Sequence, residues 1–151
     1  MNFEIRETPF EKRLYGRSKP VPENLTPVQV MFAAMDETWE IVRRNAIPNA
    51  GLNHILYSHA QRVFAGVEIT ATVDPALGLE IVEQLLPYYL YYRHVGPYEL
   101  LPVVYNQIDA EITARGLTRS GQSLEIYGHW HEDPAKLVTE ILIGLKPGQT
   151  Q

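Results

Sequence analysis

Apolar side chains recur at steps of three and four residues in two stretches of the chain, which predicts two amphipathic helices. The first follows Thr26 and Pro27, a capping residue and a proline that suit a helix start, and Pro48 ends the pattern. The residues expected on its buried face are Val28, Met31, Met35, Trp39 and Val42.

The second helix is predicted over about 99–115. Pro102 falls in its first turn, where a missing N–H is tolerated, and Gly116 stands where helices commonly end. Its expected buried residues are Leu101, Val104, Ile108 and Ile112.

Short runs rich in Val, Ile and Tyr predict strands around these helices. The clearest are 54–59, 63–70, 88–94, 124–130 and 137–145. Two weaker candidates cover 3–7 and 12–15, and a proline-rich stretch over 18–27 predicts a loop. The order is strand, helix, two strands, and then the same again, so we predict an α+β fold.

The two halves also share residues at one spacing. When the two halves are aligned, Gly51 matches Gly121, Tyr57 matches Tyr127 and His59 matches His129. A short insertion then aligns Glu68 with Glu140. We therefore predict one domain, 1–151, built from two pseudo-symmetric β-α-β-β halves of about 1–72 and 85–146, with antiparallel sheets and a central ligand cleft. A chance likeness of short helices and hairpins remains the alternative.

Composition removes several functional classes. The chain has 151 residues, 45% hydrophobic and 21% charged, which suits one globular domain. Its net charge of −5 works against nucleic-acid binding, and the absence of cysteine excludes disulfides and thiolate chemistry. We see no secretory signal at the start and no apolar run long enough to span a membrane, so we expect a cytoplasmic protein.

Four segments, in order, resemble a known family. YYRHVGPYE at 91–99 is similar to the H-x-G-P-Y segment that opens the second helix of GyrI-like domains, and FAGVEI at 64–69 to their F-x-A-G-V strand. LEIY at 124–127, followed by Asp133 and Pro134, resembles the family's E-x-Y…D-P hairpin, and TEILI at 139–143 its closing strand. Gly144 departs from the proline that is usual there.

The resemblance implies an effector-binding domain of the kind found in multidrug-responsive bacterial transcription regulators and also as a stand-alone protein. Such domains bind bulky lipophilic, often cationic compounds. The stand-alone arrangement is expected, because no residues remain for a helix-turn-helix.

Glu140 is the first candidate for the ligand-binding carboxylate. It lies within the otherwise uncharged run 137–143, which predicts a strand buried on both faces. Removing a carboxylate from water is unfavourable by several kcal/mol unless a cation compensates it. The resemblance also places the family's ligand-binding glutamate here. An edge glutamate paired with an arginine, or simply solvated, is the alternative.

Aromatic residues are expected to form the walls of the site, because their faces attract desolvated cations. Tyr127 shares a strand face with Glu125, and core packing remains the alternative for any single member. The expected ligand-binding set is Glu140, Tyr127, Tyr91, Tyr57, Trp39, Glu125 and Glu68.

Three other functions stay open or are disfavoured. If the protein is an enzyme, the resemblance suggests a hydrolase of strained cyclopropane-containing molecules, with Glu140 as base or stabiliser and Tyr127 as proton donor. A protein partner is also possible. His129 and His131 share a strand face, but their spacing is no standard zinc signature, so we expect neither a metal nor a cofactor.

Overall fold

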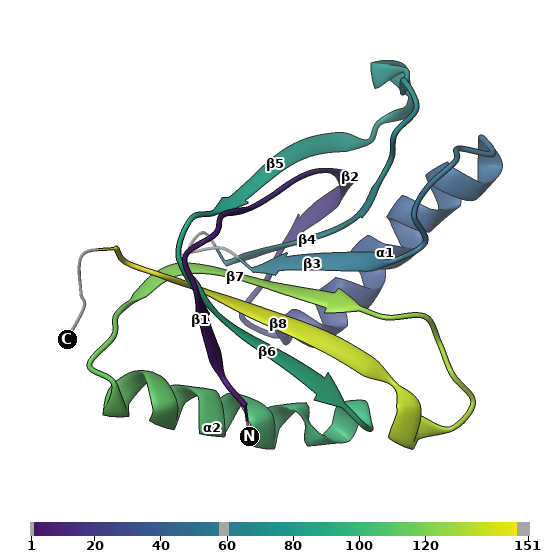
Figure 1. Ribbon diagram of the computed structural model, residues 1–151. Helices are drawn as coiled ribbons and strands as arrows, with labels where there is room; N and C mark the ends of the chain where they lie inside the picture. Colours follow the sequence, from purple (N-terminus) through teal and green to yellow (C-terminus); the bar gives the residue numbers. More distant parts are fainter. Residues whose placement is uncertain (1, 58–60, 148–151) are drawn as a thin grey trace. The chain divides into compact units, whose positions relative to one another are not determined.

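A computed structural model describes residues 2–57 and 61–147 (Figure 1). Its described residues form eight strands and two α-helices, which confirms the predicted α+β class. The chain divides into two compact units: unit 1 comprises Met1–Pro9 and Leu86–Gln151, and unit 2 comprises Phe10–Leu85. None of the described helices is long and apolar enough to cross a membrane.

Unit 2 carries the first β-α-β-β sequence. Strand β2 (Phe10–Pro20) leads into α1 (Pro27–Arg44), which is followed by β3 (Asn53–Tyr57) and β4 (Arg62–Glu68). Strand β4 pairs antiparallel with both β2 and β3, and β5 (Glu80–Leu86) completes the order β3-β4-β2-β5.

Helix α1 begins as its sequence predicts. The Thr26 hydroxyl accepts a hydrogen bond from the Gln29 N–H, and the Gln29 side chain accepts one from the Thr26 N–H, which forms a capping box. Its buried face differs in part from the prediction, because Val28 is 53% exposed whereas Ala34 is fully buried. Thr38 fixes the helix to the sheet by donating to the carbonyl oxygen of Ala65, at 2.7 Å.

Unit 1 carries the second β-α-β-β sequence. Strand β6 (Tyr89–Val95) leads into α2 (Leu101–Ala114), followed by β7 (Arg119–Tyr127) and β8 (Val138–Leu145). The short β1 (Glu4–Arg6) joins the free side of β6, which gives the order β1-β6-β8-β7.

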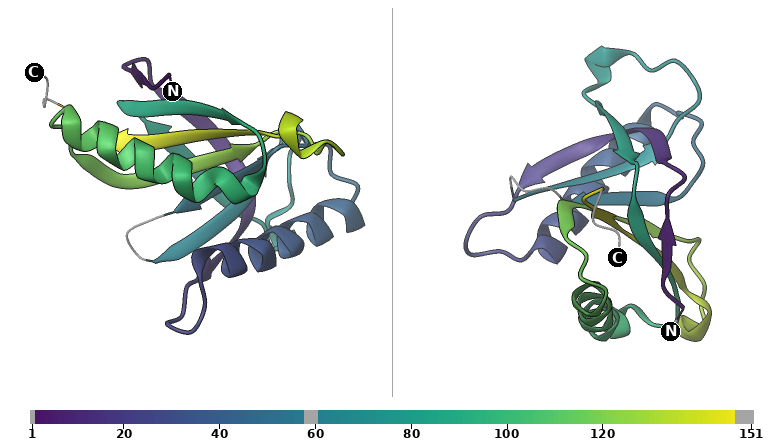
Figure 2. Two further views of the ribbon diagram at one scale, coloured as in Figure 1. Left: turned by 90° about the horizontal axis from the view of Figure 1, so that it is seen from below. Right: turned by 60° about the vertical axis from the view of Figure 1, so that its left-hand side comes forward.

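Helix α2 covers one face of the unit 1 sheet (Figure 2). The predicted stripe of Val104, Ile108 and Ile112 packs there against alternate residues of β8, including Ile141 and Ile143. Residues paired across neighbouring strands share a face, so this packing fixes which side chains of β6 and β7 also lie on the α2 side.

Several element bounds differ from the sequence predictions. Strand β2 is longer than the predicted 12–15 and runs into the predicted loop at 18–27, and the sequence pattern does not predict β5. Strand β7 begins and ends earlier than 124–130. The last two residues of the predicted strand 54–59, including His59, lie outside the described residues.

The glycine that replaces the family's proline has a local reason. A Cβ on Gly144 would collide with Ser120 Oγ and would lie 2.9 Å from the carbonyl oxygen of Gln122. The ladder between β7 and β8 shifts register between Arg119 and Ser123, so the backbone approaches β8 closely there. Only glycine fits this approach without movement.

The compact units differ from the expected halves at their edges. Residues 1–9 group with the second β-α-β-β sequence because β1 pairs with β6, and residues 73–85 group with the first because β5 pairs with β2. The single domain and the central cleft remain predictions.

Candidate ligand-binding site

The buried carboxylate of unit 1 is Glu125, in the middle of the β7 run Leu124–Glu125–Ile126. Only 4% of Glu125 is exposed. Its Cα partner is Ile141, so it lies on the face that α2 covers.

Two tyrosines hydrogen-bond to this carboxylate. Tyr127, two residues along β7, donates its hydroxyl to Glu125 Oε1 at 2.7 Å. Tyr105, from the second turn of α2, donates its hydroxyl to Glu125 Oε2. The two hydroxyl donors satisfy both carboxylate oxygens but supply no countercharge.

A third tyrosine completes this group. The ring of Tyr98, in the 3₁₀ turn Tyr98–Leu100 before α2, meets the ring of Tyr127 edge-on, with centroids 5.5 Å apart and an interplanar angle of 78°. Tyr98 is 38% exposed, yet burial of its hydroxyl raises its pKa. We call Glu125, Tyr98, Tyr105 and Tyr127 the tyrosine–glutamate cluster.

His94 supports the turn that carries Tyr98. The His94 side chain is buried, and its Nε2 donates to the carbonyl oxygen of Pro97 at 3.1 Å. This hydrogen bond braces the turn between β6 and α2. Gly96 follows with a φ of 147°, in the region that favours glycine.

Glu140 lies in a different environment. It is only partly buried, and the expectation of a strand buried on both faces fails at this position. Tyr91 donates its hydroxyl to Glu140 Oε1 at 2.6 Å, and the Arg6 guanidinium lies 3.6 Å from the centre of the Tyr91 ring. Burial, followed by the hydrogen bond to Glu140, raises the pKa of Tyr91 to about 12.

Glu125 and Glu140 therefore lie on opposite faces of the unit 1 sheet. Glu125 is paired with Ile141, whereas Glu140 is paired with Ile126, one residue out of phase. Because side chains alternate along a strand, Glu125 points to the α2 face and Glu140 away from it. Within unit 1, Tyr91 and Glu140 form one group, and Tyr127 and Glu125 form another.

The remaining predicted site residues belong to unit 2. Tyr57 ends β3 and donates its hydroxyl to the sulfur of Met31, at 3.7 Å. Trp39 donates from its indole N–H to Asn53 Oδ1 at 2.6 Å and packs against the core beside α1. Glu68 forms an ion pair with Lys12, at 3.1 Å.

The register also corrects one expected equivalence. Leu56 of β3 pairs with Phe64, as Ile126 of β7 pairs with Glu140. Phe64, and not Glu68, therefore takes the position in unit 2 that corresponds to Glu140 in unit 1.

Sequence reasoning missed Tyr105. Tyr105 follows Val104 directly, so it stands beside the apolar stripe by which the sequence predicts α2. The signal was its spacing from Leu101 and Ile108, which places the phenol one turn from both on the covered face. Among the described residues, no group of three metal-ligating side chains occurs near His129 and His131 or elsewhere.

Comparison with solved structures shows the fold. The C-terminal domain of EcmrR matches with a TM-score of 0.66 and 18% identity, covering 97% of this chain and 99% of that one. SAV2435 bound to tetraphenylphosphonium matches with a TM-score of 0.61 and 13% identity, covering 97% of this chain and 95% of that one. A hydrolase from Listeria innocua matches with a TM-score of 0.57 and 12% identity, covering 95% of this chain and 91% of that one. No curated protein sequence matches the chain.

The family comparison agrees with the motifs in the sequence. The model of the GyrI-like small molecule binding domain matches residues 1–146, nearly the whole chain. The chain belongs to the GyrI-like small-molecule-binding domain family.

Proposed function

We propose that this domain binds lipophilic organic cations, with Glu125 as the anionic group and the three tyrosines of the cluster as its aromatic wall. The observation that carries the proposal is the burial of Glu125, 4% exposed, with a tyrosine hydroxyl on each of its two oxygens. A structural neighbour was solved with tetraphenylphosphonium bound, which supports a ligand of this class.

The chemistry favours a cation that has no N–H groups. Both carboxylate oxygens already accept hydrogen bonds, so a ligand gains most from charge attraction and ring contact. At about 5 Å and an effective dielectric constant near 20, that attraction is about 3 kcal/mol. Each aromatic face adds roughly 0.5–2 kcal/mol for a desolvated cation.

Glu140, Tyr91, Tyr57, Trp39 and Glu68 stay predicted ligand contacts. Glu68 is paired with the Lys12 cation, and Glu140 is only partly buried, whereas Glu125 is 4% exposed and both of its tyrosine donors are uncharged. We therefore rank Glu125 ahead of Glu140 as the central carboxylate.

Calorimetric titration with tetraphenylphosphonium tests the proposal. Glu125→Gln should weaken binding by roughly 30- to 150-fold, equivalent to about 2–3 kcal/mol of lost charge attraction. Glu140→Gln removes the rival candidate carboxylate and, if Glu125 is the central anion, should change binding by less than about threefold. Neutral triphenylphosphine oxide should bind wild type and Glu125→Gln alike. Equal losses in the two glutamine variants would refute the assignment to Glu125.

A second candidate function is hydrolysis of a strained, cyclopropane-containing electrophile. The carboxylate of Glu125 and the hydroxyl of Tyr127 lie 2.7 Å apart, a pair able to hold and transfer a proton beside a bound substrate. A neighbouring fold is a hydrolase from Listeria innocua. Incubation of the protein with such an electrophile, followed by chromatography, distinguishes turnover from binding: an unchanged substrate that still binds excludes the enzyme.

A further inference from the structure

A polar pocket lies in unit 1, on the side of the sheet opposite α2. It has a volume of about 540 Å³, within the range of small-molecule sites. Its walls come from β1, the residue pair before it, and β6. The described residues lining it are Asn2, Glu4, Arg6, Tyr91, Tyr92 and Arg93, and none of them belongs to the tyrosine–glutamate cluster.

The strand register places a carboxylate beside this pocket. Arg93 of β6 has Glu140 of β8 as its Cα partner, so the two side chains project from the same face of the sheet. Tyr91 shares that face and donates its hydroxyl to Glu140 Oε1 at 2.6 Å. An arginine and a glutamate therefore stand directly opposite each other on paired strands.

Arg93 and Glu140 are nevertheless not joined by an ion pair. Glu140 Oε1 accepts from Tyr91, and its Oε2 has no hydrogen-bond partner in the described part of the chain. Arg93 is exposed, and its guanidinium has neither a hydrogen-bond nor an ion-pair partner among the described residues. The fold thus leaves one open set of donors beside one open acceptor.

The other two charges at the pocket neutralise each other. Arg6 donates to Glu4 Oε2 at 3.1 Å, and its guanidinium lies 3.6 Å from the centre of the Tyr91 ring. Burial and the bond to Glu140 raise the pKa of Tyr91 to about 12, whereas the charges of Arg6 and Arg93 act to lower it, so both guanidinium groups lie near the phenol. The charges open to a ligand are therefore one cation, Arg93, and one anion, Glu140.

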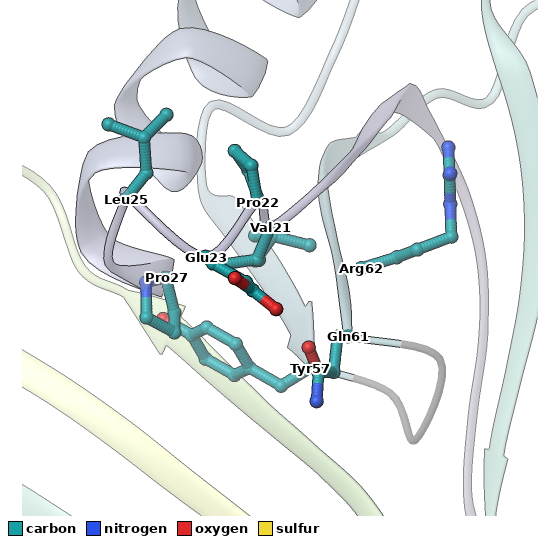
Figure 3. A pocket seen from close by; sticks show the side chains of 9 residues that line it. Val21, Pro22, Glu23, Leu25, Pro27, Tyr57, Gln61 and Arg62 are labelled. Atoms are coloured by element: carbon teal, nitrogen blue, oxygen red, sulfur yellow. The ribbon is translucent and has the colours of Figure 1, made fainter.

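A pocket of unit 2 shows a different arrangement of charge (Figure 3). Its lining includes Glu23, from the loop before α1, and Arg62, the first residue of β4. Arg62 extends away from Glu23 in Figure 3, and its guanidinium donates to Ser18 Oγ at 3.1 Å. Because these two charges are not opposed on paired strands, the unit 2 pocket serves as an internal control for the pocket of unit 1.

We propose that the unit 1 pocket binds a free α-amino acid by its zwitterionic head group, with the carboxylate on Arg93 and the ammonium on Glu140. A guanidinium presents a planar fork of N–H donors that suits a carboxylate, and Glu140 Oε2 can accept from an ammonium. Both charged groups of an α-amino acid are attached to one carbon, so one ligand can contact both side chains. The Asn2 amide lines the same pocket and can donate to the carboxylate. The inference does not depend on the proposed function of the tyrosine–glutamate cluster.

The probe for the test is L-alanine, titrated into ¹⁵N-labelled protein and followed by amide chemical shifts. Saturable shifts should appear at Tyr92, Arg93 and Glu140, and none at Val21 or Val63 of the unit 2 pocket. Propionate lacks the ammonium group, and isopropylamine lacks the carboxylate. Each should bind about two- to fivefold more weakly than L-alanine, as expected for the loss of one exposed ion pair.

Two variants assign the two contacts separately. Arg93→Gln should weaken L-alanine about two- to fivefold and leave isopropylamine unchanged, because the amine has no carboxylate. Glu140→Gln should weaken L-alanine by a similar factor and leave propionate unchanged. Arg115→Gln is the matched control, because Arg115 is exposed at the end of α2 and outside the pocket, and it should alter the binding of none of the three probes.

A further variant separates this site from the tyrosine–glutamate cluster. Glu125→Gln should leave L-alanine binding unchanged, even if that variant abolishes tetraphenylphosphonium binding. Absence of saturable shifts with L-alanine, as a direct ion pair between Arg93 and Glu140 in solution would cause, overturns the proposal. Equal binding of L-alanine and propionate, equal effects of Arg93→Gln and Arg115→Gln, or loss of L-alanine binding in Glu125→Gln would each do so as well.

Discussion

Replacing Tyr105 by phenylalanine tests whether a charged, buried Glu125 organises unit 1. The variant keeps the ring that packs beside the core of α2 and removes only the hydroxyl that donates to Glu125 Oε2. Tyr127 remains on Oε1. The change therefore isolates one donor to a carboxylate that is 4% exposed.

The expected loss follows from the type of bond. A hydrogen bond to a charged group contributes about 1.5–3 kcal/mol, and leaving a buried acceptor unsatisfied places the loss toward the upper part of that range. For a domain of this size, each kcal/mol lowers the midpoint of thermal unfolding by roughly 2–4 °C. We expect Tyr105→Phe to lower the unfolding free energy by about 2–3 kcal/mol and the midpoint by roughly 4–12 °C.

Urea unfolding at neutral pH, followed by circular dichroism, measures the free energy directly. Tyr88→Phe is the matched control, because Tyr88 packs partly buried against the same core and none of the described residues hydrogen-bonds its hydroxyl. This control should change stability by less than about 0.5 kcal/mol.

A second comparison tests the charge itself. In a Glu125→Gln background, Tyr105→Phe removes a bond to a neutral amide, so its effect should fall to about 0.5–1.5 kcal/mol. If Tyr105→Phe proves as mild as Tyr88→Phe, or equally damaging in both backgrounds, the view of Glu125 as a buried charge held by tyrosine hydroxyls is wrong.

Three further predictions concern other parts of the fold. Gly16→Ala should lower the free energy of unfolding by more than about 2 kcal/mol, because the added Cβ would overlap the carbonyl oxygen of Ala65 on the paired strand. Gly116→Ala is the control: Gly116 has a φ of 67° and open space around it, so the loss should be only about 1 kcal/mol in the same urea assay. Tyr91, with a pKa of about 12 against 10.0 for a free tyrosine, should ionise late in an ultraviolet titration, and Glu140→Gln should lower this pKa. Because the unfolded chain loses the Tyr91 proton first, the contribution of Tyr91 to stability is complete below pH 10 and is lost as the pH rises toward 12. Thr139→Val should leave stability unchanged or raise it, because the buried Thr139 hydroxyl has no partner among the described residues; a loss above about 1 kcal/mol would show that it is hydrogen-bonded in solution.

The helices could be predicted from the sequence because their signals are local. Thr26 and Pro27 mark the start of α1, and Val104, Ile108 and Ile112 repeat at four-residue steps on one face of α2. A helical pattern of this kind predicts which residues are buried when the helix packs through a single face.

The sequence does not predict strand β5 because apolar residues of this strand are exposed and a polar one is buried. Ile81 and Leu85 are 57% and 49% exposed, while the polar Gln84 is buried. The sequence of this edge strand therefore shows no alternation of buried apolar and exposed polar residues. Strand β5 forms because it pairs with β2, and not because of a pattern in its own sequence.

The central glutamate could not be chosen from sequence for a similar reason. Glu125 and Glu140 each stand between apolar neighbours on a strand, and nothing along the chain states which face a helix will cover. Only the register, with Glu125 opposite Ile141, places Glu125 beneath α2. Pairing across strands, which is non-local, decided the difference.

The placement of β1 has a consequence for how the protein folds during synthesis. Unit 2 is continuous in sequence, so all its strands are available once residue 86 has left the ribosome. Unit 1 joins residues from both ends of the chain, and β1 must wait for β6 before it gains its partner. Domains emerge from the N-terminal side, and distant pairings form slowly. Strand β1 is therefore made before unit 2 but should gain its partner only after unit 2 has folded.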